Sequence, residues 1–199
     1  MKLYVIPGAC SLAPHIALRE LGLPFDLITV DRVTKRTSDG DDYLAVNPLG
    51  YVGSLKLDDG NVLTETSTIL EYLADLKPHS GLAPLAGTWE RVRFREWLSF
   101  LSCELNSSMS PLFRDIPKEA KDVIGARLLR RFDHLDERLG QQHYVVDRAY
   151  SLADAYLFTV LLWPPRVGID MAPWPNLRRY QASIGARGAV TASMSAEGI

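Results

Sequence analysis

The sequence predicts an α+β domain followed by an all-α helical bundle domain. Three observations support this fold class: strand and helix patterns alternate over residues 1–78, a stretch rich in proline and glycine follows, and no convincing strand pattern occurs beyond it. A chain of 199 residues is long enough to form two small domains with buried cores. We therefore expect a first domain at 1–78, a linker at 79–87 and a helical domain at 88–199.

The first domain opens with a strand–helix–strand pattern. The run KLYVI at 2–6 has the composition of a buried strand, and FDLITV at 25–30 is a second such run. Between them, residues 11–21 repeat apolar side chains at helical spacing. The inner face of this helix would hold Leu12, Ile16, Ala17 and Leu21. Two strands joined through a helix favour a parallel pair with a crossover connection.

A hairpin and a second helix complete this domain. In SLKLDDGNVLTE at 54–65, two short apolar runs flank Asp59-Gly60, which is a strong hairpin signal. A helical pattern follows, and its buried side chains would be Ile69, Leu70, Leu73 and Leu76. The order βαβ then ββα predicts a sheet of about four strands with helices on its faces.

The rest of the chain is helical in pattern. KPHSGLAPLAG at 77–87 has no periodicity and indicates a linker. A long helix after it would hold one apolar face, made of Trp89, Trp97, Leu101 and Leu105 with Phe94 and Leu98 beside them. A further helix covers 118–139. Its apolar side chains are Leu128, Leu129, Phe132, Leu135 and Leu139.

The segment SLADAYLFTVLLW at 151–163 is apolar almost all round, which predicts a buried central helix. Ser151 and Asp154 stand three residues apart just before this apolar run. This spacing indicates a capping box in which aspartate replaces the usual glutamate. Pro164-Pro165 would end the helix.

Composition and charge exclude several function classes. With 22 basic and 24 acidic residues, the net charge of −2 gives no global attraction to nucleic acid or acidic membranes. No apolar run approaches the ~20 residues needed to span a bilayer, and MKLYVIPG breaks at Pro7-Gly8, too early for a signal peptide. Two cysteines are too few for a disulfide framework, so we expect a cytoplasmic protein. Scattered histidines argue against a zinc site, and we expect no metal.

Cys10 stands at a strand-to-helix junction, in PGACSLAPHIALRE at 7–20. A helix N-terminus presents unpaired N–H groups and a positive dipole end, and both lower the pKa of a thiol. The alternative is that Cys10 is a small hydrophobic residue packed under the turn. Position alone leaves these two interpretations open.

Four stretches carry a resemblance to a known family: MKLYVIPGACSLAPHIALRELGLPF, DYLAVNPLGYV, LDDGNVLTET and SLADAYLFTVLLW. With them, the chain resembles a bacterial beta-class glutathione transferase almost from end to end. The resemblance implies a thioredoxin-like N-terminal domain followed by an all-helical domain, the glutathione transferase architecture. It also implies a homodimer that binds glutathione as co-substrate and conjugates it to small hydrophobic electrophiles in detoxification.

The resemblance assigns roles to individual residues. Cys10 would lie beside the glutathione sulfur, with Ser11 and Asn106 as further catalytic residues. The glutathione-binding residues would be Lys35, Val52, Gly53, Glu65, Thr66 and Glu104, of which Glu104 would reach the site of the partner subunit. Phe113 and Trp163 would form the acceptor side, although core packing is the more ordinary role for Trp163.

Three departures from the family pattern bear on activity. Gly53 stands where many relatives have a cis-proline, so the Val52–Gly53 bond would relax to trans or stay cis, and we expect weaker glutathione binding than the fold supports. Asn106 and Ser107 replace a histidine and a lysine, and Asn106 can donate a hydrogen bond but cannot titrate. Pro164-Pro165 end the core helix early, which would reshape the acceptor pocket.

Two alternative functions stay open. The chain could reduce mixed disulfides or peroxides through a Cys10–glutathione adduct, which a second glutathione would have to resolve because no CxxC motif is present. It could also be a catalytically weak homologue that binds ligands, as Gly53 and Asn106 suggest. We further expect Cys10 to react faster with thiol probes than Cys103, which lies in the middle of a helix.

Overall fold

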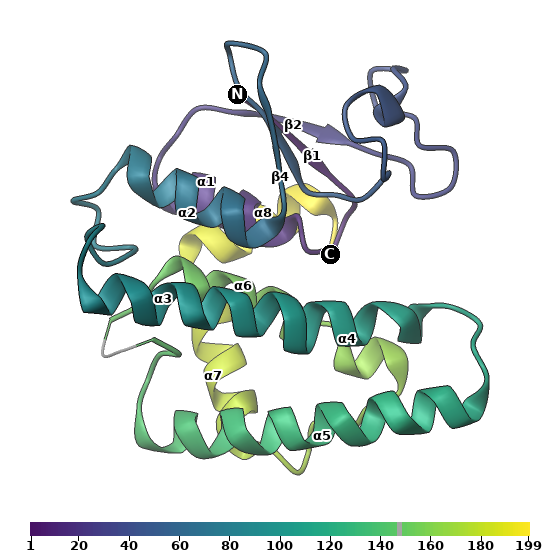
Figure 1. The fold of residues 1–199 in the computed structure, drawn as a ribbon, viewed down its shortest axis with the longest axis vertical. Helices are drawn as coiled ribbons and strands as arrows, with labels where there is room; N and C mark the ends of the chain where they lie inside the picture. Colours follow the sequence, from purple (N-terminus) through teal and green to yellow (C-terminus); the bar gives the residue numbers. More distant parts are fainter. Residues whose placement is uncertain (147–148) are drawn as a thin grey trace.

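The computed structural model describes residues 1–146 and 149–199, and its first part is a sheet with two helices on one face (Figure 1). The elements in chain order are β1 (Lys2–Val5), α1 (Leu12–Glu20), β2 (Asp26–Thr29), η1 (Tyr43–Ala45), β3 (Ser54–Lys56), β4 (Val62–Thr64) and α2 (Thr66–Leu76). The strands lie in the order β2-β1-β3-β4. This confirms the predicted α+β class and the four strands.

The sheet is mixed, as the connections require. β1 and β2 are parallel, with Lys2 opposite Asp26, because α1 carries the chain back between them. β3 is antiparallel to both β1 and β4, and the β3–β4 pair is the predicted hairpin around Asp59-Gly60. The carboxyl end of β1 therefore leads directly into the turn that holds Cys10 at the start of α1.

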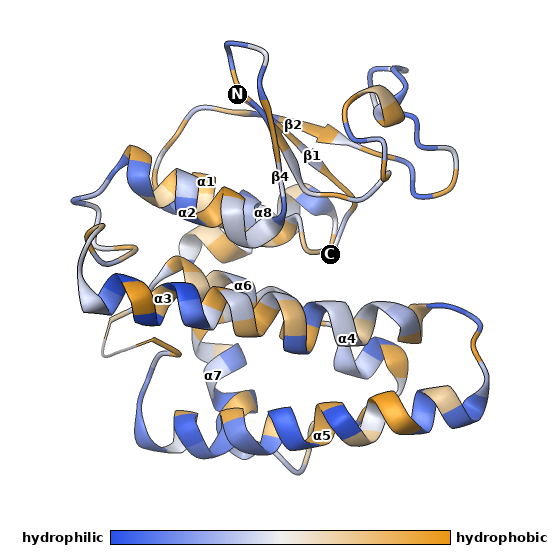
Figure 2. Cartoon of the chain, in the orientation of Figure 1, coloured by the Kyte–Doolittle hydropathy of each residue, from blue (hydrophilic) through white to orange (hydrophobic). Residues whose placement is uncertain are grey.

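The second part of the chain is helical in all its elements. These are α3 (Trp89–Phe100), a π-helical segment η2 (Leu101–Asn106), α4 (Ser107–Met109), η3 (Ser110–Phe113), α5 (Lys118–Gln141), α6 (Leu152–Leu161), η4 (Pro164–Val167), α7 (Pro175–Gly185) and α8 (Gly188–Glu197). Every residue of α6 is buried, which confirms the predicted central helix. Figure 2 shows the contrast with α5, whose visible surface is mostly hydrophilic.

One hydrophobic core passes through both domains. It joins side chains of α1 and α2 to side chains of α3, α5 and α6, because α6 packs against α1, α2 and α3. A smaller cluster of Tyr4, Ile28, Val30 and Tyr43 covers the other face of the sheet. Two predicted core residues are wrong: Leu76 is 42% exposed and Trp89 is 69% exposed. Each lies at the end of its helix, where the chain leaves the packed face.

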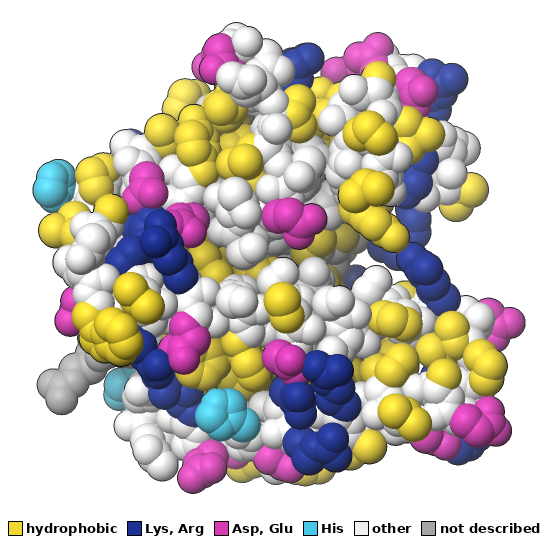
Figure 3. Space-filling model, viewed as in Figure 1, with side chains coloured by type: hydrophobic (Ala, Val, Ile, Leu, Met, Phe, Trp, Pro, Cys, Tyr) yellow, Lys and Arg dark blue, Asp and Glu magenta, His cyan; other side chains and the backbone are white. Residues whose placement is uncertain are grey.

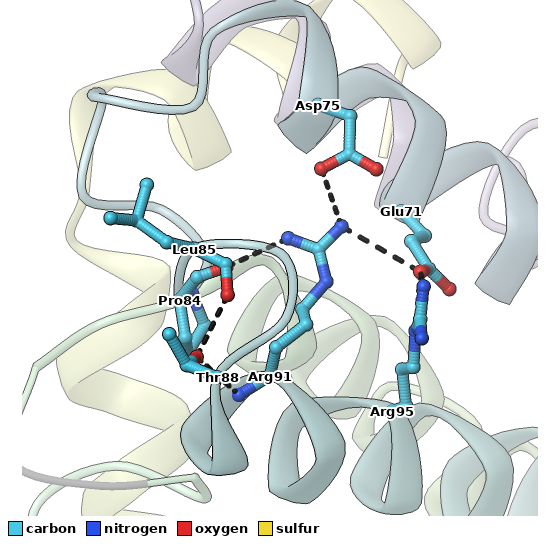
Figure 4. A network of polar contacts seen from close by, with 7 residues as sticks. All are labelled: Glu71, Asp75, Pro84, Leu85, Thr88, Arg91 and Arg95. Atoms are coloured by element: carbon cyan, nitrogen blue, oxygen red, sulfur yellow. Dashed lines mark hydrogen bonds and ion pairs between the residues drawn. The ribbon is translucent and has the colours of Figure 1, made fainter.

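Polar contacts also join the two domains. Residues 77–88, which link the two domains, contain neither helix nor strand. Arg91 of α3 reaches back to α2 (Figure 4). Its guanidinium donates to Asp75 Oδ1 at 2.6 Å and lies 3.6 Å from Glu71 Oε1. The same side chain donates to the carbonyl of Pro84 at 2.8 Å. Arg91 is buried, so these contacts hold the linker against both helices.

The last helix returns to the first domain. Figure 1 shows α8 beside α1 beneath the sheet, and the two helices are in contact. The side chain of Glu197 in α8 thereby reaches His15 in α1 and the backbone of Gly8. Within 1–146 and 149–199, no helix has both the length and the apolar character to cross a bilayer.

Candidate active site

Cys10 lies in the turn between β1 and α1. Backbone hydrogen bonds from Ala9 N to the Ile6 carbonyl and from Leu12 N to the Ala9 carbonyl, 2.9 and 3.0 Å long, form this turn. The Cys10 thiol donates to the carbonyl oxygen of Val52, with Sγ and O 2.9 Å apart. The sulfur therefore bridges from the start of α1 to the loop that precedes β3.

Burial raises the pKa of the Cys10 thiol. The Thr66 side chain and the backbone at Gly53 and Cys10 partly offset this effect, whereas the charge of Glu65 adds to it. The pKa of Cys10 is therefore shifted opposite to the direction that a helix start alone favours. The desolvation of a half-covered sulfur outweighs the favourable helix end, and a thiol that donates to a carbonyl is held in its protonated form.

We expect Cys103 to be alkylated before Cys10 in the ligand-free protein, which reverses the order that the sequence suggested. Cys103 is exposed, whereas Cys10 is partly covered and protonated, and only a thiolate reacts readily. Limiting iodoacetamide followed by peptide mapping gives the order. The rate at Cys10 should continue to rise above about pH 9, because its pKa lies above the ordinary value. Preferential labelling of Cys10 at pH 7 would show that its thiol is activated after all.

The Val52–Gly53 peptide bond is cis, so of the two expected outcomes the trans form is wrong. Gly53 packs closely against the start of α1: a Cβ at this position would lie 3.3 Å from Ser11 Cβ. The loop before it is fixed from behind, since the Tyr43 hydroxyl and the Asn47 side-chain amide donate to the carbonyl of Tyr51 at 2.6 and 2.7 Å. The backbone of Val52 is thereby held next to Cys10.

The Ser11 hydroxyl bonds to the backbone of Ile6 and not to the Cys10 sulfur. Ser11 is fully buried, and its Oγ lies 3.3 Å from Ile6 N, which donates to it, and 3.4 Å from the Ile6 carbonyl, to which it donates. These contacts tie the end of β1 to the start of α1. Ser11 therefore supports the turn that carries Cys10.

Glu65 and Thr66 lie at the start of α2, next to Cys10. Glu65 has φ +66° and ψ 116°, a backbone conformation that is uncommon for a residue with a side chain and of a kind that clusters at functional sites. Its exposed carboxylate makes no ion pair or hydrogen bond with any residue that the structure describes. Its side chain does not cap α2, so the first N–H groups of this helix and the Glu65 carboxylate together offer partners for an α-amino acid group.

Lys35 is already bound within the chain. It too has a positive φ, of 56°, and its Nζ donates to the carbonyl of Gly50 at 2.9 Å. This contact places the ammonium group two residues before Val52, on the loop that faces Cys10. The position is consistent with a carboxylate partner at the far end of a peptide that pairs with Val52.

The π-helical segment η2 holds two further predicted residues. Glu104 accepts hydrogen bonds from Arg127 and Arg131 of α5 at 2.7–2.9 Å within the same chain, and these arginines lower its pKa. A contact from Glu104 to a partner subunit would come in addition to its ion pairs with these two arginines. Asn106 is half-buried at the end of η2, and no hydrogen bond joins it to Cys10 among the described residues.

Phe113 and Trp163 do meet. Their ring centroids lie 6.1 Å apart in an edge-to-face arrangement, with Phe113 42% exposed and Trp163 6% exposed. The Trp163 indole N–H donates to the carbonyl of Gly8 at 2.9 Å, two residues before Cys10. Trp163 is thus a packed side chain, as the more ordinary interpretation held, and it also braces the turn. Phe113 is the more accessible of the two rings.

Comparisons with known proteins agree with this geometry. Residues 8–76 match the model for the N-terminal domain of glutathione S-transferases, and residues 100–187 match the model for their C-terminal domain. The chain belongs to the glutathione S-transferase family. Glutathione S-transferase GstA of Escherichia coli O157:H7 is 42% identical to this chain, and the alignment covers all of both proteins.

Two solved structures are similar to this glutathione S-transferase over the whole chain. A sphingomonad glutathione S-transferase in complex with glutathione has a TM-score of 0.97 and 46% identity, with both chains fully covered. The bacterial beta class enzyme of Sphingomonas chungbukensis has a TM-score of 0.96 and 47% identity, covering 100% of this chain and 99% of its own. The resemblance to the beta class and the thioredoxin-like first domain are therefore confirmed.

Several residues around the candidate site had no signal in the sequence. The Gly8 N–H donates to Glu197 Oε2 at 2.9 Å and the Gly8 carbonyl accepts from Trp163, so the helical domain holds the peptide units on both sides of the Gly8 Cα, close to Cys10. Glu197 Oε1 also meets His15 Nδ1 at 2.8 Å. A lone histidine and a glutamate 182 positions apart could be paired only once the fold was known.

Tyr156 of α6 is a further unpredicted neighbour of this site. Its side chain is fully buried, and within the described part of the chain no group meets its hydroxyl in hydrogen-bond geometry, although Ser102 lies nearby. Burial raises the pKa of Tyr156, the charge of Cys10 adds to this, and Ser102 lowers it in part. Among the same residues, no group of three or more His, Cys, Asp or Glu is placed to hold a metal ion.

Proposed function

We propose that this glutathione S-transferase conjugates glutathione to small hydrophobic electrophiles at Cys10. The observation that carries the proposal is the contact between the Cys10 thiol and the Val52 carbonyl. In this contact a thiol lies against the backbone of Val52, and the side chain of Thr66, at the start of α2, also interacts with the sulfur. A peptide that pairs with Val52 would bring its own cysteine to Cys10 and its γ-glutamyl end to Glu65 and Thr66.

The chemistry needs a glutathione thiolate. The glutathione thiol loses its proton to solvent, the sulfur forms a bond to the electrophilic carbon, and a leaving group such as chloride departs with the bonding electrons. Cys10 itself is held as a thiol, so it can donate its hydrogen to the glutathione sulfur in the way that it donates to the Val52 carbonyl. In this role Cys10 stabilises the nucleophile and is not consumed.

The test compares Cys10→Ser with Cys10→Ala. The wild-type protein should be retained on immobilised glutathione and turn over 1-chloro-2,4-dinitrobenzene. Cys10→Ser keeps a hydrogen donor, so its kcat/KM should stay within about threefold, whereas Cys10→Ala should lose about tenfold, equivalent to ~1.4 kcal/mol. If Cys10 works instead through a mixed disulfide, both variants lose all activity and the wild type prefers a glutathione mixed-disulfide substrate to the chlorinated aromatic.

A homodimer is part of the same proposal. Its two copies pair through the surface at the start of α3. Trp89 and Val92 project from this face with 69% and 47% exposure, and Leu85 of the linker lies close to them in the chain. Figure 3 shows hydrophobic side chains exposed on this face of both domains. Large exposed apolar groups are typical of an interface, and a two-fold pairing is the simplest closed one.

Light scattering should give a mass of twice 22.2 kDa at micromolar concentration. Trp89→Glu should shift the protein toward monomer, because it places a charge in the paired surface. Val123→Glu is the matched control, since Val123 is equally exposed but lies on α5. A monomeric wild type, or equal effects of the two substitutions, contradicts the pairing face.

We place the enzyme in a reducing compartment, the cytoplasm. Cys10 and Cys103 are both free thiols, and a protein that relies on one reduced cysteine needs such surroundings. Conjugation converts an apolar electrophile into a charged peptide derivative, which suits detoxification.

A further inference from the structure

Arg166 lies directly over the turn that leads to Cys10. It follows Trp163 in η4, where its backbone N–H donates to the Trp163 carbonyl at 2.9 Å. A Cβ built on Gly8 would meet Arg166 Nη1 at 2.7 Å and Nη2 at 3.2 Å. The guanidinium therefore packs against the backbone of Gly8, in a space that only glycine leaves open. Gly8 also has φ +69°, which favours glycine at the same position.

The guanidinium has no partner in the described part of the chain. Arg131 and Arg187, by contrast, pair with Glu104 and Glu20 at 2.7 and 2.6 Å. Arg166 makes no ion pair or side-chain hydrogen bond with any described residue, and its side chain is exposed. The carboxylate on the other side of Gly8, Glu197, is occupied by Gly8 N and His15 and makes no ion pair with Arg166.

The cation stands next to the expected acceptor side. Trp163 donates to the Gly8 carbonyl, and Phe113 packs on Trp163 with its own ring exposed. Gly8 is two residues from Cys10, a separation of at most about 7 Å between their Cα atoms. The Trp163 side chain, on which Phe113 packs, and a guanidinium with no partner among the described residues thus both lie against Gly8, two residues before Cys10.

We propose that Arg166 determines specificity by binding a carboxylate on the electrophile, so that aromatic or unsaturated acids are preferred acceptors. This inference rests on the proposed conjugation. A planar guanidinium recognises a carboxylate through two parallel hydrogen bonds, and the Phe113 ring supplies the apolar surface for the rest of the molecule. The glutathione carboxylates are expected elsewhere, at Lys35 and the start of α2. These groups all come from the first domain, whereas Arg166 comes from the second.

The test uses two electrophiles with the same reacting carbon and leaving group, 4-chloro-3,5-dinitrobenzoate and its uncharged methyl ester, and each variant is compared with the wild type on the same substrate. Arg166→Met keeps the apolar stem of the side chain and removes the guanidinium and its charge. Its kcat/KM should fall about tenfold for the acid and stay within twofold for the ester, with an unchanged KM for glutathione. Arg166→Lys should recover part of the loss. Arg178→Met is the matched control, since Arg178 is an exposed arginine on α7 and should affect neither substrate.

A binding measurement separates this inference from the proposed function. Unreactive 3,5-dinitrobenzoate should quench the fluorescence of the wild-type protein by binding beside Trp163, and Arg166→Met should bind it at least fivefold more weakly. If the wild type turns over neither electrophile but this difference in binding is found, conjugation fails and the carboxylate site stands. Equal losses for acid and ester, a raised KM for glutathione, or equal binding of 3,5-dinitrobenzoate by both proteins would overturn the role of Arg166.

Discussion

Replacing Asp154 by alanine should lower the free energy of unfolding by about 3–4 kcal/mol and the melting temperature by about 10 °C. Asp154 is fully buried at the start of α6, the helix on which both domains pack. Its carboxylate accepts from Val145 N, Ser151 N, Ser151 Oγ and the Tyr180 hydroxyl at 2.8–2.9 Å. Alanine leaves these donors buried without an acceptor, and each costs ~1 kcal/mol or more.

Thermal and urea unfolding of two further variants isolate this effect. Tyr180→Phe removes a single donor and leaves the carboxylate in place, so it should cost ~1 kcal/mol. Asp122→Ala removes only a surface contact to Lys118 and should change stability by less than ~0.5 kcal/mol. If Asp154→Ala is no more destabilising than Asp122→Ala, the carboxylate does not hold α6 in place.

Half of this cluster could be predicted from the sequence. Ser151 and Asp154 stand three residues apart before an apolar run, and the capping box is present as expected. Val145 precedes α6, and Tyr180 lies on α7, 26 residues after Asp154. No local pattern indicates these two contacts, because they depend on how α7 and the loop before α6 pack.

Some features of the candidate site could likewise be predicted from the sequence, and others could not. Cys10, Glu65 and Thr66 lie at junctions between strands and helices, which hydrophobic periodicity locates well, whereas the roles in glutathione binding, that of Val52 included, came from the family resemblance. The direction of the Cys10 pKa shift cannot be predicted in this way, because it depends on how deeply the loop at Val52 covers the sulfur. The π-helical segment at 101–106 also escapes a search for a repeat of 3.6 residues, although it holds Glu104 and Asn106.

Replacing Glu197 by alanine should cost about 3 kcal/mol of stability and lower kcat/KM about tenfold, although Glu197 does not touch the sulfur. Its two oxygens accept from Gly8 N at 2.9 Å and meet His15 Nδ1 at 2.8 Å, with both side chains fully buried. Arg19 Nε donates to His15 Nε2 at 3.0 Å, so Nδ1 carries the hydrogen that Glu197 accepts. The loss releases the turn that positions Cys10 as well as the contact between α8 and α1.

Glu197→Gln gives the sharper result, because an amide has one acceptor oxygen for two donors. Its NH₂ group would face either Gly8 N or His15 Nδ1, and His15 cannot change tautomer without turning a hydrogen toward Arg19. Glutamine should therefore lose about half as much stability as alanine. Thr191→Ala, on the exposed face of α8, should change neither stability nor kcat/KM. In a double-mutant cycle, the protein with both His15→Ala and Glu197→Ala should lose less stability than the sum of the two single losses, since both remove the same contact. Additive losses, or full activity in a destabilised Glu197→Ala protein, would show that the helical domain stabilises the fold without positioning Cys10.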